Sequence, residues 1–223
     1  GQILTQRRFR RAVKHAQNIS EDREVNARNN TVQMGESLRV QRNLIYNLRD
    51  QLMYNEIPVL GRLEKIFKEE IDRVAQEMKN RSLNDLRRYI LENYSYHFTQ
   101  IPKEVSLERP ETVKYLLGQL YQDEKRKKEN FLLESDKISE FYRLSILKAI
   151  DECWVEEVDN LQQLKNTVNT RQIGQRNTIV EYNQESYAVY QEMGSQVKRR
   201  VVRSIMLSTI THDDQGNLSI YFV

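Results

Sequence analysis

Two apolar stripes in the second half of the chain constrain its fold more than any other feature. Their members recur every three or four residues, which places each set on one face of an α-helix. The first stripe comprises Phe141, Leu144, Leu147, Ile150, Trp154, Val158, Leu161, Leu164 and Val168, and the second comprises Tyr182, Tyr190, Met193, Val197, Val201 and Ile205, interrupted at Ser186. Residues 170–178 lose this period and contain Gly174, which favours a turn. The pattern predicts two antiparallel helices of about 28 residues, each about 42 Å long, joined by an exposed tip.

Residues that break helices are rare in the remainder of the chain, which has only 7 glycines and 3 prolines in 223 residues. Residues 4–54 predict one long helix with a sparse apolar stripe. The expected members of this stripe are Val25, Val32, Leu38, Ile45, Leu48 and Leu52. Further helices are expected after Pro58 and from Pro110, because proline is tolerated in the first turn of a helix. The chain is therefore predicted to be all-α.

Two shorter segments have their own signals. Ser82 and Asp85 have the spacing of a capping box, which predicts a short helix after Ser82. Residues 95–109 lose the helical period and contain Pro102, so we expect a loop there. After residue 208, apolar and polar residues alternate on the far side of an Asp/Gly/Asn-rich turn, which predicts a small terminal β-hairpin or an extended tail.

The residue types needed for catalysis or metal binding are scattered. The glycines do not cluster into a phosphate-binding loop. His15, His97 and His212 lie far apart in sequence and Cys153 is the only cysteine, so no metal-ligand spacing is present. We interpret the acidic run Glu156, Glu157 and Asp159 as a solvated outer helix face. No catalytic, cofactor or metal site is predicted, and the chain by itself is not expected to be an enzyme.

Charge and hydropathy argue against two further classes, nucleic-acid-binding proteins and membrane-spanning proteins. The formal net charge is only +3, and the basic runs at 7–14, 125–128 and 198–203 are interpreted as solvated helical faces, so a nucleic-acid partner is not expected. The apolar runs are shorter than the ~20 residues that span a bilayer. A single cysteine, expected to be a buried thiol, is typical of a reducing compartment such as the cytoplasm. The chain starts without methionine inside a polar helical pattern, which is typical of a piece of a longer protein.

Two blocks of residues carry a family resemblance. The first consists of Ala16-Gln17, Glu21, Arg23, Arg28, Gln41-Arg42 and Ile45-Tyr46. The second consists of Leu147, Asp151 and Trp154 in the spacing L-x-x-x-D-x-x-W, followed by Arg171, Gly174, Gln175, Glu181, Tyr182 and Glu185. In their order and spacing these blocks resemble the C-terminal helical region of the SecA preprotein translocase ATPase family, over about residues 10–208.

The resemblance implies a helical scaffold domain formed by residues 1–56 and 136–210, interrupted by a helical wing domain at 57–135 and followed by a terminal strand or tail at 211–223. It implies that residues 136–210 form a two-helix finger whose tip touches a SecY-type channel and the secreted preprotein. The tip residues are Arg171, Gln172, Ile173, Gly174, Gln175 and Arg176. The residues implied to contact the motor domains are Arg23, Arg28, Gln41 and Arg42, and those implied in the structural core are Trp154 and Tyr182.

The resemblance also implies where the chemistry lies. ATP and magnesium would be bound by motor domains that precede residue 1, so the whole protein is expected to be a protein-translocating ATPase although this chain holds no cofactor. The protein is expected in the cytoplasm, associated peripherally with the inner face of the cell membrane and its acidic lipids. The resemblance thus places the energy-using step outside this chain.

Departures from the family pattern indicate a specialised member. Met34-Gly35-Glu36 stands where the family has Tyr-Asp-Asp, and the tip lacks the usual aromatic residue. Asn177-Thr178 replaces the Asp-Pro after the tip, and a cysteine-rich zinc tail after Val223 is not expected. These differences resemble an accessory SecA of Gram-positive bacteria, which exports few substrates, often glycosylated serine-rich adhesins, with accessory secretion proteins as further partners.

Two other interpretations remain open on the residues alone. A helical adaptor or RNA-binding hairpin would use the basic runs and the tyrosines, and would bind nucleic acid with a steep salt dependence at residues 198–203. Several tyrosines lie on the apolar stripes, which favours core positions over base stacking. A coiled-coil module that only dimerises would leave the stripes uncovered within one chain.

Overall fold

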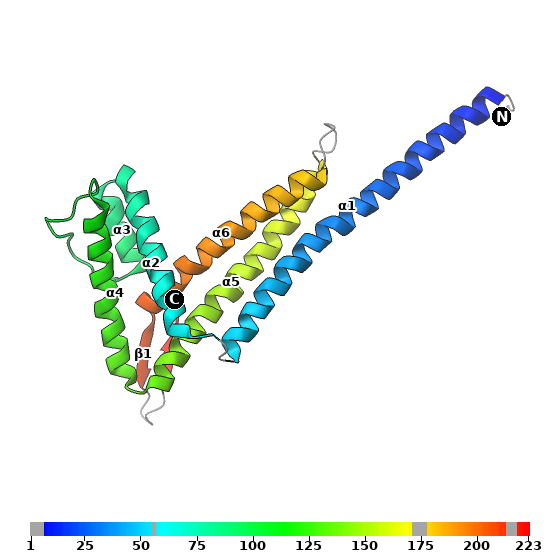
Figure 1. The fold of residues 1–223 in the computed structure, drawn as a ribbon. Helices are drawn as coiled ribbons and strands as arrows, with labels where there is room; N and C mark the ends of the chain where they lie inside the picture. Colours follow the sequence, from blue (N-terminus) through cyan, green and yellow to red (C-terminus); the bar gives the residue numbers. More distant parts are fainter. Residues whose placement is uncertain (1–6, 55–56, 171–177, 213–217) are drawn as a thin grey trace. The chain divides into compact units, whose positions relative to one another are not determined.

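The computed structural model describes residues 7–54, 57–170, 178–212 and 218–223, and most of this part is helical (Figure 1). The elements are α1 (Arg7–Met53), α2 (Val59–Glu77), the 3-10 helix η1 (Met78–Asn80), α3 (Leu83–Asn93), α4 (Pro110–Leu132), α5 (Ser135–Thr170), α6 (Thr178–Leu207), β1 (Thr209–His212) and β2 (Leu218–Tyr221). The predicted all-α class with a short terminal hairpin is confirmed. None of the helices in these four ranges combines the length and the hydrophobicity that crossing a bilayer requires.

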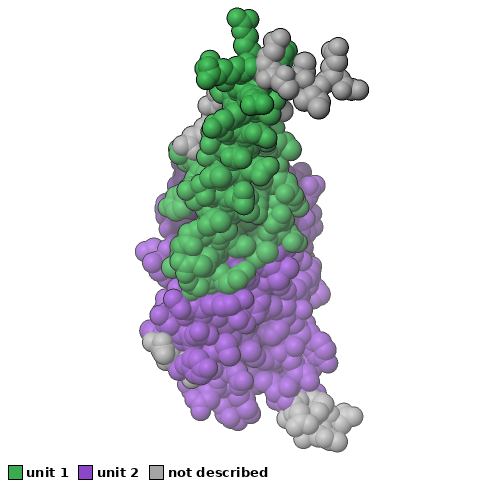
Figure 2. Space-filling model, turned by 90° about the vertical axis from the view of Figure 1, so that its right-hand side faces the viewer, with its two compact units in different colours: residues 1–44, 157–190 green, residues 45–156, 191–223 purple. Residues whose placement is uncertain are grey.

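The chain divides into two compact units, which Figure 2 shows in different colours. Unit 1 comprises residues 1–44 and 157–190, and unit 2 comprises residues 45–156 and 191–223. Helices α1, α5 and α6 each contribute residues to both units. The domain limits implied by the family resemblance stay a prediction.

The local signals for helix starts are confirmed. Helix α3 begins with a capping box in which Ser82 Oγ accepts a hydrogen bond from the Asp85 backbone N–H at 3.2 Å and the Asp85 carboxylate accepts one from the Ser82 N–H at 3.0 Å. The Ser82 hydroxyl also donates to the Asp85 carboxylate, at 2.8 Å, and the two bonds that this carboxylate accepts from Ser82 lower the pKa of Asp85. Pro110 occupies the first turn of α4, where its missing N–H costs nothing. Residues 95–109 between the two helices form no regular element.

The buried face of α1 differs from the predicted one. Val25 and Val32 were expected on its apolar stripe but are 49% and 72% exposed. The buried or half-buried positions instead follow one another in steps of four and three residues: Met34, Leu38, Gln41, Ile45, Leu48 and Leu52. The predicted stripe ran through Val25 and Val32, whereas the observed one runs through Met34 and Gln41. The sequence pattern favoured the first of these two faces and so missed Met34 and Gln41. Before residue 34 every described position of α1 is exposed except the half-buried Asn30.

The inner face of α5 is also rotated at its N-terminal end. Leu144 is 40% exposed and Leu147 is half-buried, although both were predicted on the stripe. Three-residue steps fall short of the 3.6-residue period, so successive members rotate away from the contact face. Ile150 of the predicted stripe is buried, and four side chains outside that stripe are buried in this part of the helix: Tyr142, Ile146, Ala149 and Cys153.

The C-terminal residues form the hairpin, the first of the two predicted alternatives. Strands β1 and β2 pair antiparallel, with Thr209 opposite Tyr221 and His212 opposite Leu218. The Phe222 ring, just after β2, stacks on Phe141 of α5 with ring centroids 5.9 Å apart. This aromatic contact fastens the end of the hairpin to the start of the predicted finger, within unit 2.

Candidate functional site

Unit 1 brings α1, α5 and α6 together next to the predicted finger tip. Met34, Val168 and Tyr182 form one buried cluster, each at most 2% exposed, and Leu164 and Ile179 pack against it. Val168 lies three residues before the segment 171–177 and Tyr182 five residues after it. The cluster therefore ties the ends of both finger arms nearest the tip to the long helix.

A small polar cluster lies beside this apolar one. Ser37 Oγ and Ser186 Oγ are 3.0 Å apart and share a hydrogen bond. Gln41 Nε2 donates to the Ser186 backbone carbonyl at 3.2 Å, and Gln41 is only 6% exposed. Buried polar groups are costly unless they are paired, so these bonds favour one alignment of α1 against α6.

A shallow groove of about 590 Å³ follows the same two helices. Val40 and Leu44 of α1 and Tyr190 of α6 line it together with the polar cluster. Val40 and Leu44 are 46% and 51% exposed, so the groove presents apolar surface to its surroundings. A surface of this kind suits contact with a protein segment better than binding of a small polar molecule.

The structure corrects the interpretation of the acidic run on α5. Glu156 and Asp159 are exposed, as expected, but Glu157 is 1% exposed. Burial raises the pKa of its carboxyl group to about 7, and Glu157 Oε1 has no hydrogen-bond partner among the described residues. Besides burial, the charge of Glu157 helps to raise the pKa values of Tyr182 and Tyr190 on α6. Three-residue spacing from Trp154 puts Glu157 on the buried face, a signal that its charge concealed.

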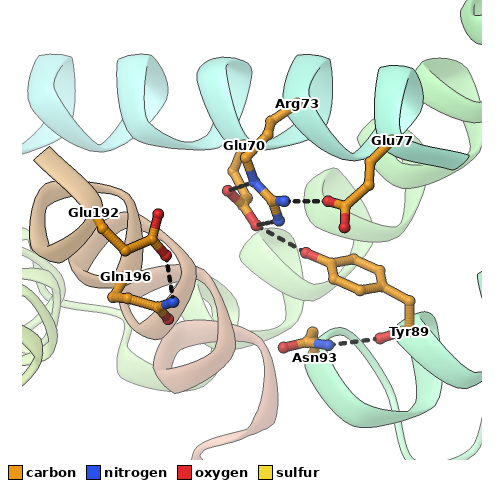
Figure 3. A network of polar contacts seen from close by, with 7 residues as sticks. All are labelled: Glu70, Arg73, Glu77, Tyr89, Asn93, Glu192 and Gln196. Atoms are coloured by element: carbon orange, nitrogen blue, oxygen red, sulfur yellow. Dashed lines mark hydrogen bonds and ion pairs between the residues drawn. The ribbon is translucent and has the colours of Figure 1, made fainter. Parts of the chain in front are cut away.

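Unit 2 contains a second buried carboxylate, which is paired (Figure 3). Glu70 on α2 is 1% exposed and receives two hydrogen bonds from the Arg73 guanidinium, at 2.6 and 2.9 Å. The Tyr89 hydroxyl of α3 donates to it at 2.9 Å, and Arg73 also contacts the Glu77 carboxylate. Burial raises the pKa of Tyr89, so that hydroxyl remains a donor at neutral pH. This network joins α2 to α3 and was not predicted from the sequence.

The basic runs in unit 2 are largely paired with carboxylates. Lys198 Nζ lies 2.6 Å from Glu69, and Lys125 Nζ lies 2.5 Å from Glu64. The run at 125–128 was predicted to be a solvated face, but Lys128 is buried. It is 6% exposed, and its ammonium donates to the Ser208 carbonyl at 2.8 Å. That bond satisfies backbone oxygen where α6 ends, in the manner of a C-terminal cap. Charges that are already paired in this way are less available to nucleic-acid phosphates.

The predicted site residues are distributed as follows. All six tip residues, Arg171 to Arg176, lie outside the described residues, so their role stays a prediction. Arg23, Arg28 and Arg42 are exposed on α1, whereas the Gln41 amide is used within unit 1. The two residues implied in the structural core have low exposed fractions, 9% for Trp154 and 2% for Tyr182. Within the described ranges, no three His, Cys, Asp or Glu side chains are grouped so that they could hold a metal ion.

The chain is similar to known proteins along nearly its whole length. Residues 3–209 match the family model described as the SecA Wing and Scaffold domain. Relatives named protein translocase subunit SecA 2 are 34% identical over 221 residues in Streptococcus gordonii, 33% over 219 residues in Streptococcus sanguinis strain SK36 and 31% over 219 residues in Staphylococcus aureus strain Newman. These alignments cover 98–99% of this chain and 28% of each relative. The chain thus spans under a third of the length of the curated relatives it matches.

Proposed function

Because the chain belongs to the SecA wing and scaffold domain family, we propose that it is the scaffold, wing and finger part of an accessory SecA-type motor that exports a subset of preproteins. The proposed division is a scaffold at 1–56 and 136–210, a wing at 57–135 and a terminal hairpin after residue 210. The relatives are named protein translocase subunit SecA 2, and this name supports the proposal of an accessory SecA.

One observation carries this proposal: α1 is only half covered. Its C-terminal half buries Met34, Ile45 and Leu52, whereas the positions from Arg7 to Gln33 are exposed apart from the half-buried Asn30. In Figure 1 the N-terminal part of α1 continues past the ends of α5 and α6. In proteins, most of the stability of a helix comes from tertiary packing of one of its faces. Its exposed half is therefore suited to lie along further domains, as a brace for the proposed motor.

The second part of the proposal concerns the finger. Helices α5 and α6 are held to α1 by the cluster of Met34, Val168 and Tyr182, just below the tip. A finger that transmits force has to be stiff, and buried contacts close to its tip supply stiffness there. We propose that the tip, with Ile173 as an apolar contact and Arg171 and Arg176 as cations, touches a SecY-type channel and the secreted chain.

The remaining partners follow from the same proposal. ATP and magnesium would act in the motor domains of the longer protein, which this chain would serve without binding nucleotide. Glycosylated serine-rich adhesins are the proposed class of substrate, and accessory secretion proteins and acidic lipids at the inner membrane face are proposed contacts. In this proposal no side chain of this chain takes part in a chemical reaction.

The test is photo-crosslinking in the longer protein that carries this chain. A photoreactive residue replaces Ile173, and the matched control replaces Asn160, which is exposed on α5 away from the tip. During ATP-driven export we expect adducts to the channel or the secreted protein from position 173 and none from position 160. Export that continues with no adduct from position 173 would refute the finger role and leave only the brace.

A further inference from the structure

A small polar pocket of about 220 Å³ lies between α5 and α6 in unit 2. Its polar side chains are Lys148, Glu152, Arg200, Arg203 and Ser204. Three cations and one carboxylate give this lining a net charge of +2. The pocket is distinct from the apolar groove of unit 1, and the proposed export function assigns nothing to it.

The existing ion pairs use only part of this positive charge. Lys148 Nζ lies 2.5 Å from Glu152 and also donates to the Val223 backbone oxygen at 3.4 Å. Arg200 pairs with Glu156, outside the pocket, at 2.6 Å and with Glu152 at 3.5 Å. Counting both carboxylates, one positive charge remains. Within the described part of the chain Arg203 forms no ion pair and no side-chain hydrogen bond, so its guanidinium donors are available.

Ser204 provides a second, independent observation. Its side chain lines the pocket and is 3% exposed, yet its hydroxyl oxygen has no hydrogen-bond partner among the described residues. A serine inside a helix ordinarily satisfies its hydroxyl by bonding to the carbonyl four residues earlier. Leaving a buried hydroxyl unpaired costs about 1–3 kcal/mol of stability. A ligand oxygen in the pocket would remove that cost.

We propose that this pocket binds a phosphate group. A tetrahedral phosphate has enough oxygens to accept from the Arg203 guanidinium, the Lys148 ammonium and the Ser204 hydroxyl together, whereas a carboxylate has only two. The volume corresponds to roughly seven water molecules, which leaves room for a phosphate and part of the group that carries it. Both a free phosphate compound and a phospholipid headgroup present this chemistry.

In the first arm of the test, the chain is titrated with inorganic phosphate at constant ionic strength, and isothermal titration calorimetry measures the affinity. Arg203→Ala and Ser204→Ala should each weaken binding by about tenfold or more, the loss expected for one hydrogen bond to a charged group. The matched control is Arg126→Ala, which removes an exposed arginine of α4 outside the pocket, and it should change affinity less than about twofold.

Ser204→Ala also guards against misfolding as an explanation. The variant removes an unpaired buried hydroxyl, so its melting temperature should equal or exceed that of the parent chain. Binding lost with folding intact would assign the loss to the site itself. Equal phosphate affinity for Ser204→Ala, Arg203→Ala and Arg126→Ala would overturn a site for free phosphate.

The second arm identifies the source of the phosphate. The same variants are sedimented with phosphatidylcholine vesicles that contain or lack phosphatidic acid. Binding that needs phosphatidic acid, Arg203 and Ser204 assigns the pocket to a lipid headgroup, and binding of inorganic phosphate alone assigns it to a soluble compound. If neither ligand distinguishes the pocket variants from Arg126→Ala, the proposal is wrong, and the export proposal stands or falls separately on its crosslinks.

Discussion

Glu70 and Glu157 are two carboxylates with equal burial and opposite surroundings. Each is 1% exposed, but Glu70 accepts hydrogen bonds from Arg73 and Tyr89, whereas Glu157 Oε1 has no partner among the described residues. A buried charge without a partner is costly, and a carboxyl group avoids this cost by binding a proton. Glu157 therefore has a raised pKa, near 7.

Replacing Glu157 by glutamine should make the chain more stable at high pH. The folded-state pKa of about 7 lies above the ordinary value of 4.5, so the unfolded chain loses this proton first as the pH rises. The stabilising contribution is complete below pH 4.5 and is lost by pH 7. Glu157→Gln cannot ionise and so avoids this loss of stability. Its free energy of unfolding in urea should exceed that of the parent chain by about 1–2 kcal/mol at pH 8 and by less at pH 5.

Asp159→Asn is the control, because Asp159 is an exposed carboxylate on the same helix. Its unfolding free energy should follow that of the parent chain at both pH values. Other carboxylates, such as Glu69 and Asp85, have lowered pKa values and destabilise the folded chain in acid, so only the difference between parent and variant isolates Glu157. A constant difference between pH 5 and pH 8 would contradict the burial of an ionisable Glu157.

Sequence analysis could place these carboxylates on helices but not in the interior. Glu70 follows Phe67 by three residues and Glu157 follows Trp154 by three. This helical spacing puts each glutamate on the same face as a buried aromatic residue. Charged residues are almost never fully buried unless paired, so the residue type outweighed the period. The partners of Glu70 come from α2 itself and from α3, and only the folded arrangement brings Tyr89 to it.

At the scale of one element, α1 shows why a polar helix is hard to orient from sequence. Two stripes compete in it, one through Val25 and Val32 and one through Met34 and Gln41. Glutamine hides the second stripe, although Gln41 is 6% exposed. The helices were predicted correctly, because they follow from caps, prolines and the scarcity of glycine, but α5 begins at Ser135, six residues before the predicted stripe. The buried face depends on partners more than 100 residues away, such as Ser186.

A pair of substitutions separates these two stripes. Met34→Ala removes a side chain that is 1% exposed and packs with Val168 and Tyr182, so it should cost about 2–5 kcal/mol of unfolding free energy. Val32→Ala, two residues earlier and 72% exposed, should change it by less than about 0.5 kcal/mol. Urea unfolding of both variants followed by circular dichroism measures the difference. A larger cost for Val32→Ala would restore the stripe predicted from sequence.

At the scale of the whole molecule, the family resemblance supplied what periodicity could not. Periodicity indicated that 141–168 and 182–205 are helical, but not that α1 packs on both of them. The order of matching residues pointed to a scaffold and a finger, and the family match over residues 3–209 agrees with the resemblance. The finger tip lies outside the described residues, so its contacts rest on the resemblance alone.

Half-coverage of α1 leads to a prediction for the whole chain. Backbone amides from Arg7 to Gln33 belong to a helix segment with almost no tertiary contact, so its opening free energy should be near zero. Amides from Met34 to Met53 lie beside buried side chains and open only with them. In hydrogen exchange followed by mass spectrometry, the first segment should exchange at least about 100-fold faster than the second.

The same measurement on the longer protein distinguishes a brace from a free extension. If α1 lies along motor domains, residues 7–33 should gain protection there while residues 34–53 change little, since their partners are already within this chain. Strong protection of residues 7–33 in the isolated chain, unchanged on dilution, would contradict this and show that the helix needs no outside support. Protection that falls on dilution would instead reveal association between copies, which also covers exposed helix faces.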